Sequence, residues 1–136
     1  MAYWLVKSEP GTWSWDAHAK AGAADSWTGV RNFQARAHLN AMKPGDGVLY
    51  YHSGDEKAVV GVSEVVRTAY PDPTDKDGKF VAVDLRVDKK LGRPVTLAEI
   101  KADPAFKDMV LVKSSRLSVQ PVTADEWKRI NDMGSR

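Results

Sequence analysis

The chain contains no cysteine, and this absence removes several kinds of chemistry at once. Without thiols there is no disulfide scaffold, no thiolate metal site and no cysteine nucleophile. Long hydrophobic runs are missing as well, because no apolar stretch approaches the ~20 residues that a membrane-crossing helix needs. The opening segment, residues 1–7, is short and soon charged, unlike a secretory signal. We therefore expect a cytoplasmic protein, or a nuclear one if the source organism has a nucleus.

An excess of charge of one sign is also lacking. The 20 Lys and Arg residues nearly balance 18 Asp and Glu residues, for a net charge of +2, and the isoelectric point is near 8.8. A protein that binds nucleic acid mainly through its overall charge is expected to have an isoelectric point above ~9. Any binding of nucleic acid would therefore depend on a pocket with a local basic rim. What is abundant is tryptophan, with five residues in 136, a side chain that serves cores and ligand pockets alike.

The apolar pattern runs through the whole chain without a linker or repeat, which predicts one domain over residues 1–136. Two capping boxes, Thr96-x-x-Glu99 and Thr123-x-x-Glu126, predict the starts of short helices. Further helices are expected from Ser14 to Gly22 and over residues 31–42. Alternation and turn signals predict strands at 3–7, 47–53, 58–69, 80–88, 110–112 and 117–122. About five or six short strands with short helices between them indicate an α+β fold, best satisfied by a twisted, partly closed barrel.

Enzyme signatures are scarce. Gly45 to Gly47 lacks the lysine and the helix of a phosphate-binding loop. The three histidines, His18, His38 and His52, are scattered along the chain, whereas a zinc site needs at least three protein ligands. The sequence therefore predicts a protein that is not an enzyme and that holds no metal and no cofactor.

The segment Lys7-Ser8-Glu9-Pro10 follows the first predicted strand and carries three different polar groups in succession. One interpretation is a strand end with solvated charges. The other is a site in which a carboxylate is held inward. Such a carboxylate accepts hydrogen bonds from the exocyclic amino group of a base.

A second segment runs from Trp27 through Gly29 into the predicted helix that carries Arg31, Asn32, Gln34 and Arg36. Asn and Gln each offer both a donor and an acceptor, Arg grips phosphate with two hydrogen bonds, and a helix N-terminus favours anions. The alternative, equally open at this point, places Trp27 in the core and the arginines on the surface.

Two further segments are candidates. On the predicted strand, alternation sends Tyr51 and Ser53 to one face and Tyr50 and His52 to the other; we expect one face to be core and the other to line a cavity. For His52 a structural, hydrogen-bonded role is favoured. Near the C-terminus, Arg116 is flanked by hydroxyls that include Ser118, a cluster that suits either a phosphate or a local turn.

Taken together, these segments resemble the EVE domain family. The resemblance covers nearly the whole chain. It is carried by ordered motifs: residues 3–5 with 7–10, 27–32, 51–53, 70–72, and 116–121 with 126–127. It implies a PUA-like β-pseudobarrel, related to the YTH and ASCH domains, that binds modified bases, with 5-methylcytosine and its oxidised forms linked to eukaryotic members. Longer family members carry an extended segment where this chain has only Thr74 to Lys79, which implies a more open rim.

The resemblance also implies which residues form the site. Base-binding positions would be Lys7, Ser8, Glu9, Trp27, Val30, Arg31, Asn32, Tyr51, His52 and Ser53. From the chemistry of these residues we expect Trp27 to stack on the base and Glu9 and Asn32 to read its polar edges. The flanking phosphates would be contacted by Arg31, Arg36, Arg116 and Ser118. We expect a monomer that binds DNA or RNA carrying a modified base. The alternatives are an enzyme acting on a nucleotide, for which Lys7 and Glu9 are the candidate acid–base pair, and a general RNA-binding module.

Overall fold

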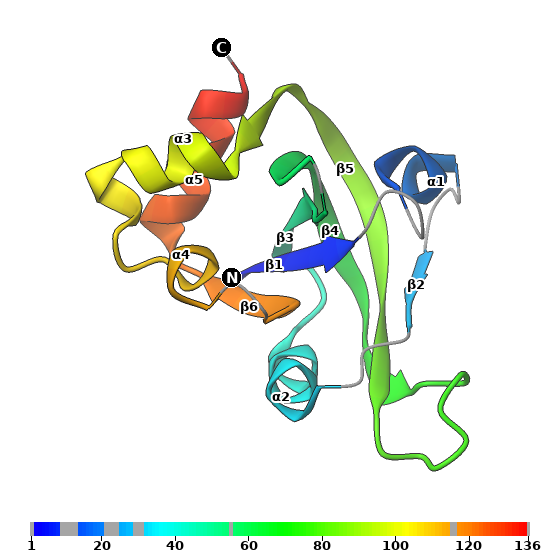
Figure 1. Cartoon of the computed structure of the whole chain (residues 1–136). Coiled ribbons are helices and arrows are strands. Elements are labelled where there is room, and N and C mark those ends of the chain that lie inside the picture. Colours follow the sequence, from blue (N-terminus) through cyan, green and yellow to red (C-terminus); the bar gives the residue numbers. More distant parts are fainter. Residues whose placement is uncertain are drawn as a thin grey trace.

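The computed structural model describes residues 2–8, 14–20, 25–28, 32–54, 56–114 and 117–135, with only the backbone described for residues 25–27. Helices and strands are interspersed along the chain, with three strands in succession in its middle part (Figure 1). In order they are β1 (Tyr3–Ser8), α1 (Trp15–Lys20), β2 (Asp25–Trp27), α2 (Phe33–Ala41), β3 (Gly47–His52), β4 (Ala58–Pro71), β5 (Val81–Thr96), α3 (Leu97–Ala102), the 3-10 helix η1 (Pro104–Phe106), α4 (Val110–Lys113), β6 (Val119–Val122) and α5 (Ala124–Gly134).

The strands form one mixed, six-stranded sheet in the order β2-β5-β4-β3-β1-β6. β1 and β3 are parallel, and the other neighbours are antiparallel. The parallel pair is possible because the long connection through α1, β2 and α2 returns the chain to the same end of the sheet. β4 and β5 form a long ribbon whose register shifts at several bulges, and such bulges bend and twist a sheet.

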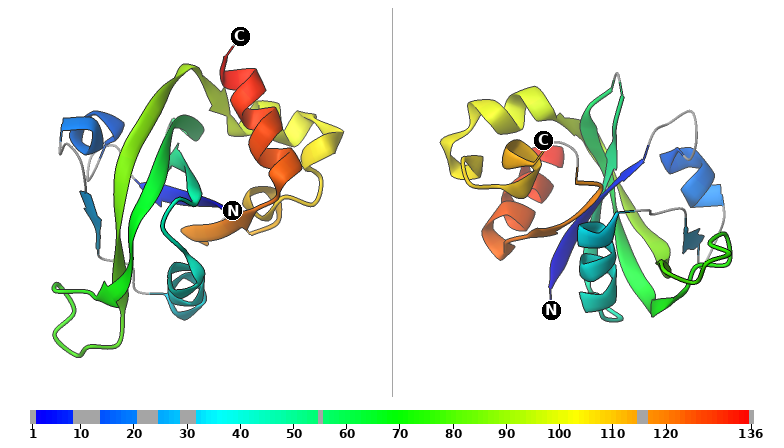
Figure 2. Two further views of the ribbon diagram at one scale, coloured as in Figure 1. Left: turned by 180° about the vertical axis from the view of Figure 1, so that it is seen from behind. Right: turned by 60° about the horizontal axis from the view of Figure 1, so that its bottom comes forward.

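Helices cover both faces of this sheet. α3, α4 and α5 gather on one side, and α1 lies on the other (Figures 1 and 2). One buried cluster joins the strands to Trp15 of α1 and to Ala35 and Leu39 of α2; we call it the α1–α2 core. The second joins the opposite face to Ile100, Phe106, Leu111 and Ile130, and is called the α3–α5 core. The central strand β3 is buried along its whole length because both cores press on it.

The predicted α+β class and most predicted elements are confirmed. Both capping boxes form: Thr96 accepts from the N–H of Glu99, and Thr123 accepts from that of Glu126, each at 3.2 Å. The predicted strand at 110–112 is wrong, because these residues form α4. The Ser114 N–H donates to the Val110 carbonyl at 2.7 Å, closing a helical turn that buries Leu111. Tertiary packing here overrides the strand preference of valine.

Candidate functional site

The parallel pairing of β1 with β3 brings two predicted site segments together. Lys7 lies opposite Tyr51, and Ser8 lies opposite His52. The Ser53 N–H donates to the Ser8 carbonyl at 2.9 Å, which continues the pairing beyond the strand ends. Carboxyl ends of neighbouring parallel strands are where α/β sheets place their ligand crevices. We call this edge of the sheet, formed by Lys7, Ser8 and residues 51–53, the strand-end cluster.

Ser118 joins the same edge from the other side of β1. Its carbonyl accepts a 2.9 Å hydrogen bond from the Lys7 N–H, just before β6 begins. The hydroxyl-bearing segment near the C-terminus is therefore a neighbour of the Lys7 segment in space. Arg116 itself lies outside the described residues.

Strand alternation divides the strand-end cluster between the two faces of the sheet. Lys7 and Tyr51 lie on the face of the α3–α5 core, which contains Tyr51. The Lys7 ammonium is 5.8 Å from the centre of the Tyr51 ring. Burial lowers the pKa of Lys7 and raises the pKa of Tyr51, because desolvation disfavours the charged form of each group. Lys7 and Tyr51 therefore lie on the opposite face of the sheet from His52.

His52 lies on the opposite face, beside α1, and both of its ring nitrogens are engaged. Nε2 accepts a 2.9 Å hydrogen bond from the Trp15 N–H, so the ring proton is on Nδ1. Nδ1–H in turn donates to Glu56 at 2.7 Å. This is the structural role that the sequence favoured for His52: it fastens the first residue of α1 to the end of β3.

Aromatic rings outside the predicted site pack around the hydrogen-bonded His52. The Tyr50 ring stacks on His18 at 5.0 Å, and Trp15 meets Tyr50 edge-on at 5.4 Å. His18 Nε2 is 2.8 Å from the Ser63 hydroxyl and is fully buried. The signal in the sequence was the spacing of Trp15 and His18, which puts both on one helix face. The sequence predicted one core face and one cavity-lining face for this strand, but Tyr50 and Tyr51 are both buried, so each face is packed in a core at these residues.

The second predicted segment enters the structure through β2 and α2. Trp27 ends β2 opposite Val83 of β5. Asn32 is the N-cap of α2, and its side-chain oxygen accepts from the Ala35 N–H at 2.9 Å. Part of its hydrogen-bonding capacity is therefore used by the helix. The Trp27 side chain lies outside the described residues, as do the whole residues Glu9, Val30 and Arg31.

Arg36 lies one turn into α2 and is engaged with the loop between β4 and β5. Its guanidinium donates to the Lys79 carbonyl at 2.8 Å and lies 4.7 Å from the centre of the Phe33 ring. The phosphate contact predicted for Arg36 stays a prediction.

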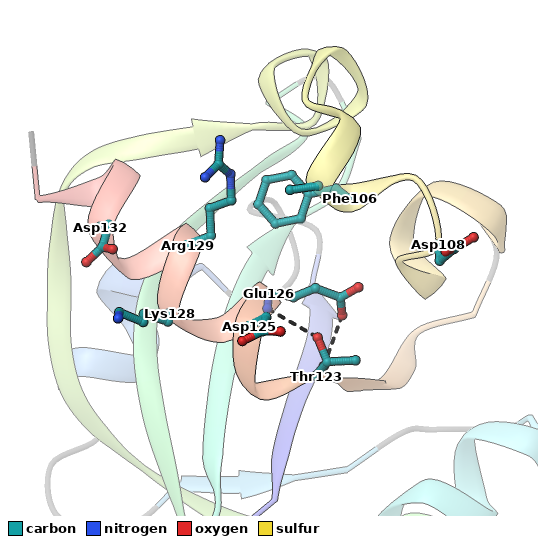
Figure 3. Close-up of a pocket in the computed structure, with 9 residues that line it drawn as sticks. Phe106, Asp108, Thr123, Asp125, Glu126, Lys128, Arg129 and Asp132 are labelled. Carbon is teal, nitrogen blue, oxygen red and sulfur yellow. Dashed lines mark hydrogen bonds between the residues drawn. The ribbon is translucent and has the colours of Figure 1, made fainter.

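A separate surface groove of about 530 Å³ lies between η1 and α5 (Figure 3). Phe106 forms its apolar part, and Lys128, Arg129 and acidic side chains such as Asp125 and Asp132 form the rest. Glu126, which also lines it, is held by the capping box with Thr123. The groove contains none of the predicted site residues, and its mixed charges do not select one ligand sign.

Neither a metal site nor a membrane span emerges from the described part of the chain. Those residues contain no group of three or more His, Cys, Asp or Glu side chains able to hold a metal ion. Over the same ranges, no helix has the length and apolar character to cross a membrane.

Comparison with known proteins identifies the family. The family model for the EVE domain matches residues 2–133. The chain belongs to the EVE domain family. Human thymocyte nuclear protein 1 is 33% identical to it over 159 residues, which cover 93% of this chain and 71% of the human protein.

Solved structures of EVE domain proteins share the fold. Rpa0253 from Rhodopseudomonas palustris superposes with a TM-score of 0.92 at 58% identity, covering 98% of this chain and 93% of that one. Human THYN1 was solved in complex with DNA containing 5-methylcytosine; its TM-score is 0.89 at 33% identity, covering 100% of this chain and 99% of that one. The YTH domain of Zygosaccharomyces rouxii MRB1 has a TM-score of 0.63 at 21% identity, covering 99% and 85%, and shows the fold alone. The predicted PUA-like EVE fold is confirmed.

Proposed function

We propose that this EVE domain binds nucleic acid carrying a modified base, 5-methylcytosine or a related modification, and that it acts as a monomeric, cytoplasmic binder rather than as an enzyme. The observation that carries the proposal is the human relative in complex with DNA containing 5-methylcytosine, which covers this whole chain at 33% identity. The described ends of β1 and β3 support it, because they place polar side chains at one end of the sheet, Lys7 on one face and Ser8 on the other.

Energetics decide what the site must supply. Extruding a base from a duplex costs a few kcal/mol, and one aromatic stacking contact returns ~1–3 kcal/mol. Stacking therefore only offsets extrusion. Additional contacts to the modification, or a target that is already single-stranded, must provide the net affinity.

The enzyme alternative is favoured by one observation, the half-buried Lys7. Burial lowers its pKa, which is how proteins prepare a lysine for proton transfer. The same burial also suits a lysine whose stem packs beside Tyr51. Incubation of the protein with modified and unmodified nucleotides, followed by chromatography for products, separates the two. We expect no turnover.

The test of binding is a fluorescence-anisotropy screen of oligonucleotides that differ only in one cytosine, with and without the 5-methyl group, in single- and double-stranded DNA and in RNA. We expect tighter binding of a modified form. Trp27→Ala should lose that preference, with affinity for the modified form falling roughly ten- to a hundredfold through the lost stacking face. Trp27→Phe is the matched control, because it retains an aromatic face.

Thermal unfolding of the same variants separates a pocket role from a core role. If Trp27 were core, its truncation should cost ~3–5 kcal/mol of stability. A Trp27→Ala protein that melts far below the wild type, yet still discriminates between the bases when cooled, would contradict the stacking role. Equal binding of modified and unmodified oligonucleotides by the wild type would contradict the proposed function.

A further inference from the structure

An exposed aromatic group lies at the start of α2. Phe33 is 60% exposed, and its ring centre is 5.1 Å from that of Phe80, at the entry to β5. The Arg36 guanidinium lies 4.7 Å from the Phe33 ring centre and 6.0 Å from that of Phe80. We call these three side chains the Phe33 platform. It combines a solvent-facing ring with a permanent positive charge.

The loop that carries Phe80 is held by its own hydrogen bonds. One carboxylate oxygen of Asp75 accepts from the N–H groups of both Lys79 and Phe80, each at 2.8 Å. Arg36 fastens the same loop to α2 through the Lys79 carbonyl. These bonds fix the loop without help from the outer face of Phe33. The contact with Phe80 therefore accounts for one side of the Phe33 ring, whereas its exposed side has no role in holding the loop.

The position of the platform relates it to the proposed base site. Asn32, one of the predicted base-binding residues, is the N-cap directly before Phe33. Trp27 lies opposite Val83, and Phe80 precedes Val83 by three residues, just before β5 begins. At ~3.3 Å per strand residue this separation is about 10 Å. Stacked nucleotides are 3.4 Å apart along one strand, so roughly three nucleotides span this backbone separation.

We propose that the Phe33 platform stacks on an unpaired base that flanks the modified base, so that the protein engages a single-stranded segment on one side of its target. The inference rests on the proposed function and extends it to the neighbouring nucleotides. A flat ring offers stacking to any base, and the adjacent guanidinium adds a cation–π contribution. One exposed ring beside a positive charge suits the planar base and anionic phosphate of a nucleotide better than an apolar peptide, which needs a groove to enclose it.

The test uses single-stranded oligonucleotides with one modified cytosine, and a second set in which each of the three nucleotides on either side is replaced, one at a time, by an abasic residue. Phe33→Ala should weaken binding of the intact oligonucleotide about tenfold or more. The loss of affinity caused by Phe33→Ala should largely disappear when the abasic residue replaces the base that stacks on the platform. Phe33→Leu should behave like Phe33→Ala, Phe33→Tyr should retain affinity, and Asn40→Ala, exposed at the other end of the same helix, should bind like the wild type.

Each outcome separates the platform from the base site. A wild type that discriminates modified from unmodified bases while Phe33→Ala and Phe33→Leu bind normally overturns the platform and leaves the proposed function intact. An equal loss with every abasic oligonucleotide also overturns the platform, because a stacked base must occupy one position. If the wild type binds both cytosines equally and Phe33→Ala weakens both, the platform stands and the proposed function fails. A wild type that binds no oligonucleotide overturns both.

Discussion

At the scale of single residues, Asp46 shows how one buried carboxylate organises a strand entry. Only 4% of Asp46 is exposed, and its oxygens accept from Trp4 Nε1 at 3.0 Å and from the N–H groups of Lys43 at 3.0 Å and Ala2 at 3.1 Å. Burial by itself raises the pKa of this carboxyl, but the three hydrogen bonds outweigh it, and the net pKa is lowered. The ionised form therefore ties the turn before β3 to the start of β1.

Replacing this carboxylate tests its contribution. Asp46→Asn should lower the free energy of unfolding at pH 7 by about 1–3 kcal/mol, because a charged acceptor with three donors becomes a neutral amide. Since the folded pKa is lowered, the contribution of Asp46 is complete above the ordinary aspartate pKa and is lost as the pH falls through the folded value. In denaturant unfolding, the stabilities of wild type and variant should therefore begin to converge below about pH 4 and meet only below the folded pKa of Asp46.

Asp88→Asn, which changes an exposed carboxylate on β5, is the matched control and should leave stability nearly unchanged. A constant difference between wild type and Asp46→Asn over the whole pH range would contradict the assigned role of the charge.

At the scale of elements, two glycines allow helices to pack closely on the sheet. A Cβ at Gly61 of β4 would lie 2.4 Å from Cη2 of Trp15, the first residue of α1. A Cβ at Gly47 of β3 would lie equally close to the Trp127 ring of α5, which also stacks on Tyr3 at 4.5 Å. Each tryptophan ring thus rests directly on strand backbone. For α1 this contact, together with the His52 bond to the Trp15 N–H, fixes its place beside the strand-end cluster.

Gly61→Ala should therefore destabilise the protein by about 1–3 kcal/mol, although alanine suits a strand better than glycine does. In a Trp15→Phe background the same substitution should cost much less, because phenylalanine lacks the ring atoms that the new methyl group meets. A double-mutant cycle of unfolding free energies measures this coupling. Additive effects of the two substitutions would show that Trp15 is not the cause.

At the scale of the whole molecule, a net charge of +2 leaves little long-range attraction for nucleic acid. Affinity must come from local contacts, and the exposed cations on the far side, such as Lys101 of α3, belong to a different face from α1. The proposed phosphate contacts are few, so the affinity should fall only gently as the salt concentration rises.

We expect Arg31→Ala and Arg116→Ala each to flatten the slope of log affinity against log salt by about 0.7 on single-stranded targets. Both should weaken modified and unmodified oligonucleotides in equal proportion, because phosphate contacts position a target without identifying its bases. Binding isotherms at several salt concentrations measure both quantities, with Lys101→Ala as the control. Loss of discrimination with an unchanged slope would assign these arginines to base recognition instead.

The sequence by itself determined the features that depend on near neighbours in the chain. The capping boxes at Thr96 and Thr123 involve residues three apart, and both form as predicted. The alternation that buries Val83 and Leu85 of β5 is likewise local, since it follows from the pleat of one strand. The absence of cysteine excluded a disulfide scaffold outright. The ordered motifs, taken together, indicated the EVE domain family, which the comparisons confirm.

Only the tertiary structure decided which distant residues meet. β2 exists because Asp25–Trp27 pairs with β5, and three residues alone carry no strand signal. The parallel register of β1 and β3 sets Lys7 beside Tyr51 and Ser8 beside His52, and the pleat then sends the two pairs to opposite faces. The platform of Phe33, Arg36 and Phe80 likewise joins a helix to a remote loop. These contacts depend on strand pairing and packing across the whole chain, which no local pattern of residues encodes.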